Sequence, residues 1–308
     1  MKIQANGISI EVEDGGACDN TGTDGHRGGR PAVLLIMGLG MQLVAWPAAF
    51  VKALEDAGHR VVRFDNRDIG LSQHFDHLGV PNLAWESFRH RLDLPVRAPY
   101  RLQDMARDAL GVLDALGIGR AHVVGVSMGG MIAQRLALLA PERVLSLTSI
   151  MSSSGARYLP GPKAPVLRAL FGRPKNPGEQ GLVDHTVELL RLIGSPAFPA
   201  DEAVLRERIL LATRRSLHPA GTLRQIAAVA ADTGRADELH RVHSPTLVLH
   251  GRHDPLVPVA CGHDTARRIP GARLIGIEGM GHDLSPGVVE HLLGPLIPHL
   301  RRAGQAVS

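Results

Sequence analysis

Aromatic side chains are scarce in this sequence, since Phe, Trp and Tyr together make up 3% of its 308 residues. Proteins that hold single-stranded nucleic acid stack the bases on aromatic rings, so the composition argues against that class of partner. The net charge gives it little support either, because 34 basic residues are opposed by 30 acidic ones and the excess is only +4. The charge therefore indicates a mildly basic, solvated surface, and we expect no nucleic-acid partner.

Cysteines and long apolar runs are also few. Cys18 and Cys261 lie in unrelated contexts and predict no disulfide framework. Cys18 belongs to residues 14–30, whose Gly, Asp and Thr content predicts a mobile surface loop. No apolar run approaches the roughly 20 residues of a membrane-spanning helix, and residues 1–7 contain no apolar signal segment. We therefore expect a cytoplasmic protein with no membrane partner, and the oligomeric state is left open.

What the sequence does have is a regular alternation of two patterns. Short apolar runs rich in β-branched residues predict buried strands, and stretches with apolar residues at helical spacing predict helices between them. This alternation is typical of an α/β fold with a mostly parallel central sheet flanked by helices. The expected strands are 3–5, 8–13, 31–37, 60–64, 121–126, 143–150, 245–250 and 273–277, and the expected helices are 42–57, 102–116, 131–140 and 286–302.

The alternation is interrupted by one long insertion without strand signals. Residues 155–199 are rich in Pro, Gly and Arg, and residues 201–231 have the pattern of short amphipathic helices. An insertion of this length predicts a helical cap, or lid, over the carboxyl edge of the sheet. The expected domains are a core of residues 1–151 and 236–308 and a cap of residues 152–235.

A serine stands on the turn between one predicted strand and the next predicted helix. The pattern Gly125-x-Ser127-x-Gly129 is that of a nucleophile elbow, in which the serine adopts a strained backbone and projects above the sheet. Larger side chains at the two glycines would collide with the neighbouring strand and helix. The Met128 backbone N–H, at the start of the helix, is then available to an oxyanion. The alternative is a Gly-Ser-rich loop that only begins a helix.

A serine hydroxyl needs an imidazole to take its proton and a carboxylate to orient that imidazole. Asp254 and His282 each follow a predicted strand, and the order Ser, Asp, His is the one that the elbow motif requires. Taken singly, the aspartate could be a turn residue and the histidine a surface residue. His250 and His253 flank the aspartate and either orient it or are solvated turn residues.

From about Ile8 to Leu300 the chain resembles the α/β-hydrolase superfamily. The resemblance implies a catalytic triad of Ser127, Asp254 and His282. It also implies an oxyanion hole formed by the backbone N–H groups of Leu39 and Met128. The runs 37–47 and 64–68 are similar to the serine esterase branch that includes anthracycline methyl esterases. Many relatives carry His-Gly after the third strand, where this chain has Met37-Gly38, but a backbone donor does not depend on that side chain.

These features predict a serine hydrolase that cleaves uncharged carboxylic esters through an acyl-enzyme, with a small-molecule ester as substrate and no cofactor. The expected substrate-binding residues are apolar: Leu39, Met41, Trp46 and Met128. Two alternatives within enzymes share the triad, namely carbon–carbon bond hydrolases and lactonases. A third is a ligand-binding receptor of the same fold with little turnover.

Two weaker motifs are compatible with other functions. The glycines at 38 and 40 begin like a dinucleotide fingerprint but lack its final glycine. His74, Asp76 and His77 are close enough in sequence to suggest metal ligands, but no second patterned cluster accompanies them and a polar loop explains them as well. We expect no metal site.

Overall fold

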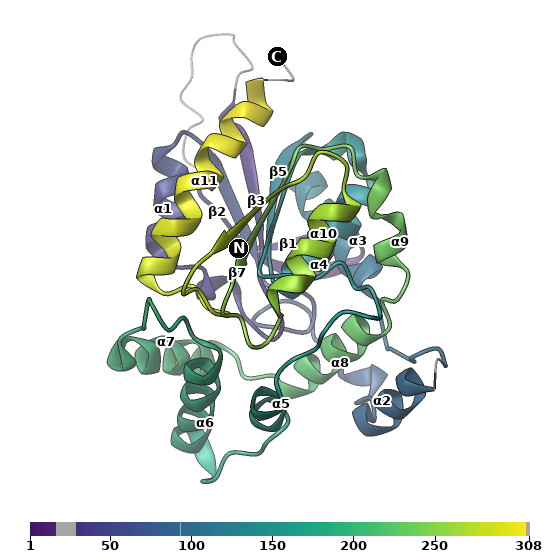
Figure 1. Cartoon of the computed structure of the whole chain (residues 1–308), viewed down its shortest axis with the longest axis vertical. Coiled ribbons are helices and arrows are strands. Elements are labelled where there is room, and N and C mark those ends of the chain that lie inside the picture. Colours follow the sequence, from purple (N-terminus) through teal and green to yellow (C-terminus); the bar gives the residue numbers. More distant parts are fainter. Residues whose placement is uncertain (17–28, 93, 306–308) are drawn as a thin grey trace.

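The computed structural model describes residues 1–16, 29–92 and 94–305, so most of the predicted loop at 14–30, with Cys18, lies outside the described residues. Eight strands form one sheet in the order β1-β2-β4-β3-β5-β6-β7-β8 (Figure 1). The strands are β1 (Lys2–Ala5), β2 (Ile8–Asp14), β3 (Ala32–Ile36), β4 (Arg60–Phe64), β5 (Ala121–Val126), β6 (Val144–Ile150), β7 (Thr246–Gly251) and β8 (Arg273–Ile277).

The sheet is mostly parallel, as predicted. Strands β3 to β8 pair in parallel with their neighbours, whereas β1 and β2 form an antiparallel hairpin that adds to the edge of β4. Every residue of β3, β5 and β7 is buried, because helices cover both faces of a parallel sheet. The apolar runs that predicted these strands are therefore explained by burial on two sides.

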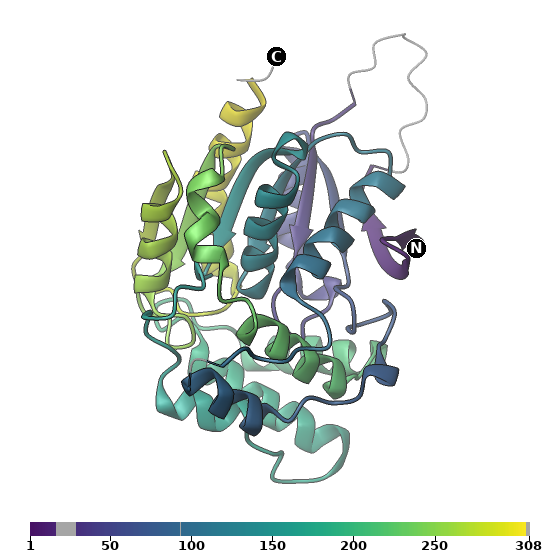
Figure 2. The ribbon, with the colours of Figure 1, turned by 90° about the vertical axis from the view of Figure 1, so that its right-hand side faces the viewer.

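Two layers of helices enclose the sheet (Figure 2). Successive residues of β3 point to opposite faces, so Leu34 joins the core under α3 and α4, and Leu35 joins the core under α1 and α11. The helices of these layers are α1 (Ala48–Asp56), α3 (Leu102–Ala115), α4 (Met128–Leu139), α10 (Val259–Arg268) and α11 (Pro286–Gln305).

One predicted helix is shorter than expected. The helical pattern at 42–57 divides into a 3₁₀ turn, η1 (Leu43–Ala45), and α1, with Pro47 immediately before α1. Proline has no backbone N–H and a fixed φ, so it suits the start of a helix and not its interior. Helices α2 (Leu83–Arg91) and α10 were not predicted from the sequence.

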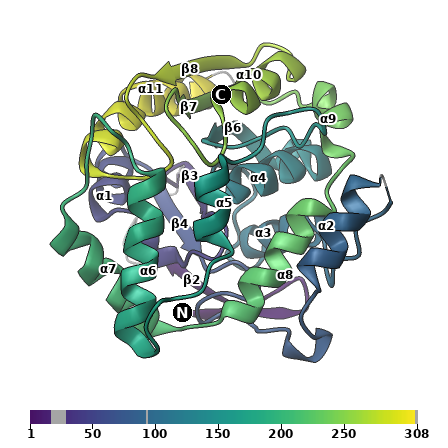
Figure 3. The same cartoon turned by 60° about the horizontal axis from the view of Figure 1, so that its bottom comes forward.

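Between β6 and β7 the chain forms helices and no strand, and all residues of this stretch are described. The helices are α5 (Ala164–Leu170), α6 (Gly178–Ile193), α7 (Glu202–Arg215), α8 (Pro219–Ala230) and α9 (Arg235–Glu238), followed by the 3₁₀ turn η4 (Leu239–Arg241). Further 3₁₀ turns outside this stretch are η2 (Asp76–Leu78) and η3 (Pro141–Arg143). Helices α5 to α8 lie across the end of the sheet at which the parallel strands finish, with α2 beside α8 (Figure 3). None of the described helices combines the length and the apolar character needed to cross a bilayer.

Candidate active site

Ser127 lies on the tight turn between β5 and α4, with φ 55° and ψ −121°. A positive φ is strained for a residue with a side chain, and it persists only where the surroundings enforce it. The flanking glycines explain how the turn closes. A Cβ on Gly125 would lie 2.1 Å from the Gly129 carbonyl oxygen, and a Cβ on Gly129 would lie 2.0 Å from that of Ile36. Only glycine fits at both positions, which is the steric reason for the spacing of the motif.

The two predicted partners of the serine lie beside it. His282, in the segment between β8 and α11, has its Nε2 3.0 Å from Ser127 Oγ. Its Nδ1 lies 2.6 Å from Asp254 Oδ2, and both side chains are buried. Nδ1 therefore donates to the carboxylate, which leaves the Nε2 lone pair directed at the serine hydroxyl.

The Asp254 carboxylate is fixed by the turn that follows β7. Its Oδ1 accepts hydrogen bonds from the backbone N–H groups of Leu256 and Val257, at 2.9 Å and 2.8 Å. His250 supports the same turn, because its Nε2 lies 2.7 Å from the Val257 carbonyl oxygen. Burial lowers the pKa of His250, so this ring is neutral beside the carboxylate. His253 is exposed, and its Nδ1 accepts a hydrogen bond from the Gly279 N–H in the segment that carries His282.

The segment after β3 packs directly against the serine. A Cβ on Gly38 would lie 3.3 Å from Ser127 Cβ and 3.9 Å from its Oγ. Within the described part of the chain, the backbone N–H groups of Leu39 and Met128 donate to no other residue. Two unpaired donors thus flank the serine turn, which is the arrangement that an oxyanion needs.

Polar side chains from two directions hold this segment in place. Asn66 Nδ2 donates to the Met37 carbonyl at 2.9 Å, and Asp65 Oδ1 accepts the Leu43 N–H at 2.7 Å. From α8 in the predicted cap, Gln225 Oε1 accepts the Gly40 N–H at 2.9 Å. Gly40 and Gln225 are 185 residues apart, and no local pattern in the sequence indicated that they would meet.

The four residues predicted to bind substrate have different surroundings. Met128 is buried in the core under α3 and α4, Leu39 is partly buried against the same core, and Met41 is 40% exposed. Trp46 is 1% exposed and stacks on Phe50 in the core under α1, with 5.1 Å between ring centroids.

The histidine cluster that suggested a metal site has a different composition from the expected one. His74 and Asp76 come together with His218 of the cap, and His77 is not in the group. The rings of His74 and His218 stack with centroids 3.8 Å apart and planes 6° apart. Because an imidazole lone pair lies in the ring plane, one ion cannot be bound by both parallel rings. Arg224 Nη2 also lies 3.0 Å from Asp76 Oδ1, so the group is an ion-pair cluster between cap and core.

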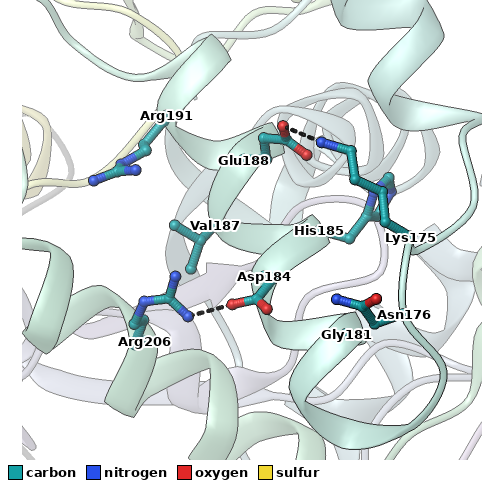
Figure 4. A pocket seen from close by; sticks show the side chains of 9 residues that line it. All are labelled: Lys175, Asn176, Gly181, Asp184, His185, Val187, Glu188, Arg191 and Arg206. Atoms are coloured by element: carbon teal, nitrogen blue, oxygen red, sulfur yellow. Dashed lines mark hydrogen bonds and ion pairs between the residues drawn. The ribbon is translucent and has the colours of Figure 1, made fainter.

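A separate hollow of about 250 Å³ lies between α6, α7 and the residues that precede α6 (Figure 4). Four of its charged groups form two ion pairs, Lys175 with Glu188 at 3.0 Å and Arg206 with Asp184 at 2.5 Å, and Arg191 pairs with Glu202 outside the lining. The hollow is therefore a charged surface feature of the predicted cap, and no residue of the Ser127 site lines it.

The model of the family described as alpha/beta hydrolase fold matches residues 31–286 of this chain. The chain therefore belongs to the α/β hydrolase family, and the fold class predicted from the sequence is confirmed.

Individual relatives agree with this assignment. The chain is 34% identical over 294 residues to rhodomycin D methylesterase DauP of Streptomyces sp. (strain C5), covering 88% of this chain and 91% of that protein. It is 30% identical over 285 residues to a 2-hydroxy-6-oxononadienedioate/2-hydroxy-6-oxononatrienedioate hydrolase of Burkholderia vietnamiensis, covering 88% and 87%. The solved structure of the enol-lactonase from Burkholderia xenovorans LB400 has a TM-score of 0.70 at 24% identity, covering 98% of this chain and 100% of that one. The predicted resemblance to methyl esterases is confirmed.

Proposed function

We propose that this protein is a serine hydrolase of uncharged carboxylic esters, with Ser127 as nucleophile, His282 as general base and acid, and Asp254 as the carboxylate that orients the histidine. The observation that carries the proposal is the continuous chain of hydrogen bonds at 3.0 Å and 2.6 Å that joins these three side chains. The serine stands at a positive φ on a strand-to-helix turn, as a nucleophile elbow requires.

The reaction follows from these positions. His282 Nε2 accepts the hydroxyl proton as Ser127 Oγ attacks the ester carbonyl, and the tetrahedral intermediate carries the negative charge on its oxygen. When the intermediate collapses, the C–O bond to the alcohol breaks and His282 delivers the proton to the leaving oxygen. A water molecule, deprotonated by the same nitrogen, then attacks the acyl-serine and releases the acid. Asp254 stabilises the imidazolium that forms in both steps.

The oxyanion is bound by the backbone N–H groups of Leu39 and Met128, and loss of one such donor typically costs about 3 kcal/mol of barrier stabilisation. Of the four apolar residues predicted to contact substrate, we assign side-chain contacts to Leu39 and Met41, since the side chains of Trp46 and Met128 are buried in the core and Met128 contributes its backbone N–H. We divide the chain into a core of residues 1–151 and 236–308 and a cap of 152–235. No cofactor enters any step. A cytoplasmic location remains a prediction from the sequence.

Methyl esters are the substrate class that the comparisons favour, because rhodomycin D methylesterase DauP is 34% identical to this chain over most of both lengths. Carbon–carbon bond hydrolysis remains the second candidate, because a relative named for a dienedioate hydrolase matches at 30% over a similar span. A receptor without turnover has less support, since the Ser127–His282–Asp254 chain is assembled for proton transfer.

A substrate panel tests the proposal. Initial rates are measured on 4-nitrophenyl esters of increasing acyl length, on the matching anilides, on a methyl ester and on a vinylogous 1,5-diketone that reports carbon–carbon cleavage. We expect kcat/KM to rise about fourfold per methylene, because each buried methylene contributes about 0.8 kcal/mol. Anilides should react far more slowly, since their poorer leaving group needs a proton from His282. A flat response to chain length, a preference for anilides, or faster cleavage of the diketone would contradict the esterase assignment.

A further inference from the structure

The segment that joins α6 to α7 lies against the segment that carries His282. Two backbone hydrogen bonds connect them: the His282 N–H donates to the Ile193 carbonyl at 2.7 Å, and the Ala197 N–H donates to the Gly279 carbonyl at 3.1 Å. Figure 3 views the end of the molecule at which these segments meet. The end of a cap helix is thus bonded to the backbone of the candidate base itself.

Two side chains reinforce this contact. Ser195 Oγ donates to Asp283 Oδ1 at 2.6 Å, and the Ser195 N–H donates to Asp283 Oδ2 at 3.1 Å. Ser195 Oγ also accepts the Gly281 N–H at 2.9 Å. The cap residue is therefore bonded to the residues immediately before and immediately after His282. Ser195 is only 3% exposed, so little water is available to replace these bonds.

The two backbones also meet without room for side chains. A Cβ on Gly281 would lie 2.3 Å from the Gly194 carbonyl oxygen, and a Cβ on Gly279 would lie 2.2 Å from Ala197 Cβ. The segment at 278–285 has no helix or strand of its own, so external contacts determine where its backbone lies. The remaining anchors come from the other side, where the His253 N–H donates to the Met280 carbonyl at 3.0 Å.

We propose that Ser195 and Asp283 form a latch, a hydrogen-bonded pair that positions His282 for proton transfer. The rate of ester hydrolysis then depends on how closely the end of α6 packs against the segment that carries His282. This proposal rests on the proposed function of His282 as the base. Ser195 and Asp283 are positioning residues, because each acts on the reaction through His282. Through the latch, the cap helps to hold the position of His282 in addition to covering the site. Movement of the C-terminal end of α6 would therefore move His282 away from Ser127.

The test compares Ser195→Ala and Asp283→Asn with a matched control, Ser154→Ala. Ser154 is also a buried serine between residue 152 and residue 235, and its Oγ donates to Asp264 Oδ2 at 2.6 Å. It therefore matches Ser195 in chemistry, but its hydrogen bond is not to the segment that carries His282. The measurements are kcat and KM on a 4-nitrophenyl ester and the rate constant for modification of Ser127 by an alkyl fluorophosphonate. That rate constant is a property of the folded molecules, so it reports on the site even in a variant of reduced stability.

We expect kcat and the modification rate to fall up to about 10²-fold in both latch variants, because a misplacement of about 1 Å has that cost. KM should change little, since substrate contacts are intact, and the control should behave as the wild type. Latch variants that match Ser154→Ala in both rates would overturn the latch while leaving the serine mechanism in place. If the fluorophosphonate does not modify Ser127 in the wild type, the proposed function and the latch are both overturned.

Discussion

At the scale of single residues, the site depends on the backbone at Ser127. The positive φ of this residue is held by close contacts that leave no space for a side chain at Gly125, Gly129 or Gly130. The strain is therefore sustained by packing on both sides of the turn. It places the hydroxyl where His282 can reach it.

Replacing Gly129 by alanine tests this account. The added methyl would lie 2.0 Å from the Ile36 carbonyl oxygen, a backbone atom that cannot move without shifting β3. We expect Gly129→Ala to lower the free energy of unfolding by about 3 kcal/mol and to abolish ester hydrolysis. Gly294, inside α11, has open space around its Cβ position, so Gly294→Ala should be stabilising by up to about 1 kcal/mol. Urea denaturation measures both, and equal effects of the two substitutions would contradict the steric argument.

The three residues that the sequence singled out and that the structure brings together, Ser127, Asp254 and His282, were all found from local patterns. The motif around Ser127, and the strand ends at Asp254 and His282, could be read because the turn, the strand and the helix are neighbours in sequence. The bond between Ser195 and Asp283 spans 88 residues and has no local signature. The hydrogen bond between Gln225 and Gly40 has no local signature either. Tertiary packing decides which side chain of the cap meets a given loop.

At the scale of elements, the strands were easier to predict than the helices. Buried strands such as β3 are continuous apolar runs, and β5 is one apart from His122, a pattern that few other elements imitate. The insertion was predicted to be helical, but α6 was not located within it, because the Pro and Gly residues of 155–199 suggested irregular structure. In the structure these breakers lie at the two ends of α6, with Pro177 before it, Gly178 and Gly181 in its first turn and Gly194 after it. Helix α10 was missed because its exposed face is polar and only one side is buried, so the apolar signal within ten residues is weak.

At the scale of the whole molecule, three buried histidines on one side of the sheet connect stability to pH. Burial, with the nearby rings of His59 and His299, lowers the pKa of His122 to about 4. Burial, with Arg302 nearby, lowers the pKa of His299 to about 4, and burial also lowers the pKa of His59. The Nε2 atoms of all three have no hydrogen-bond partner among the described residues, so a proton there would be unsatisfied in the core.

The sign of the pH dependence follows from these directions. Between the unfolded pKa of 6.5 and the folded value of about 4, the unfolded chain binds protons that the folded protein does not. We expect the free energy of unfolding to be highest above pH 6.5 and to fall as the pH drops toward 4, by on the order of 3 kcal/mol for each of His122 and His299. His122→Gln should flatten this dependence, and the exposed His240→Gln should not. Urea denaturation at a series of pH values measures this dependence. If the free energy of unfolding of His122→Gln falls with pH as steeply as that of the wild type, the assignment of the effect to His122 is contradicted.

The central claim is that Ser127 is the nucleophile, and the turnover of an aryl ester by Ser127→Ala tests it most directly. The substitution removes one oxygen from a partly exposed turn, so the protein should keep its fold and its unfolding temperature. We predict a loss of kcat on the order of 10⁶-fold, because the covalent step cannot occur without the hydroxyl. A folded Ser127→Ala protein that retained ester hydrolysis within about tenfold of the wild type would contradict the assignment of the site.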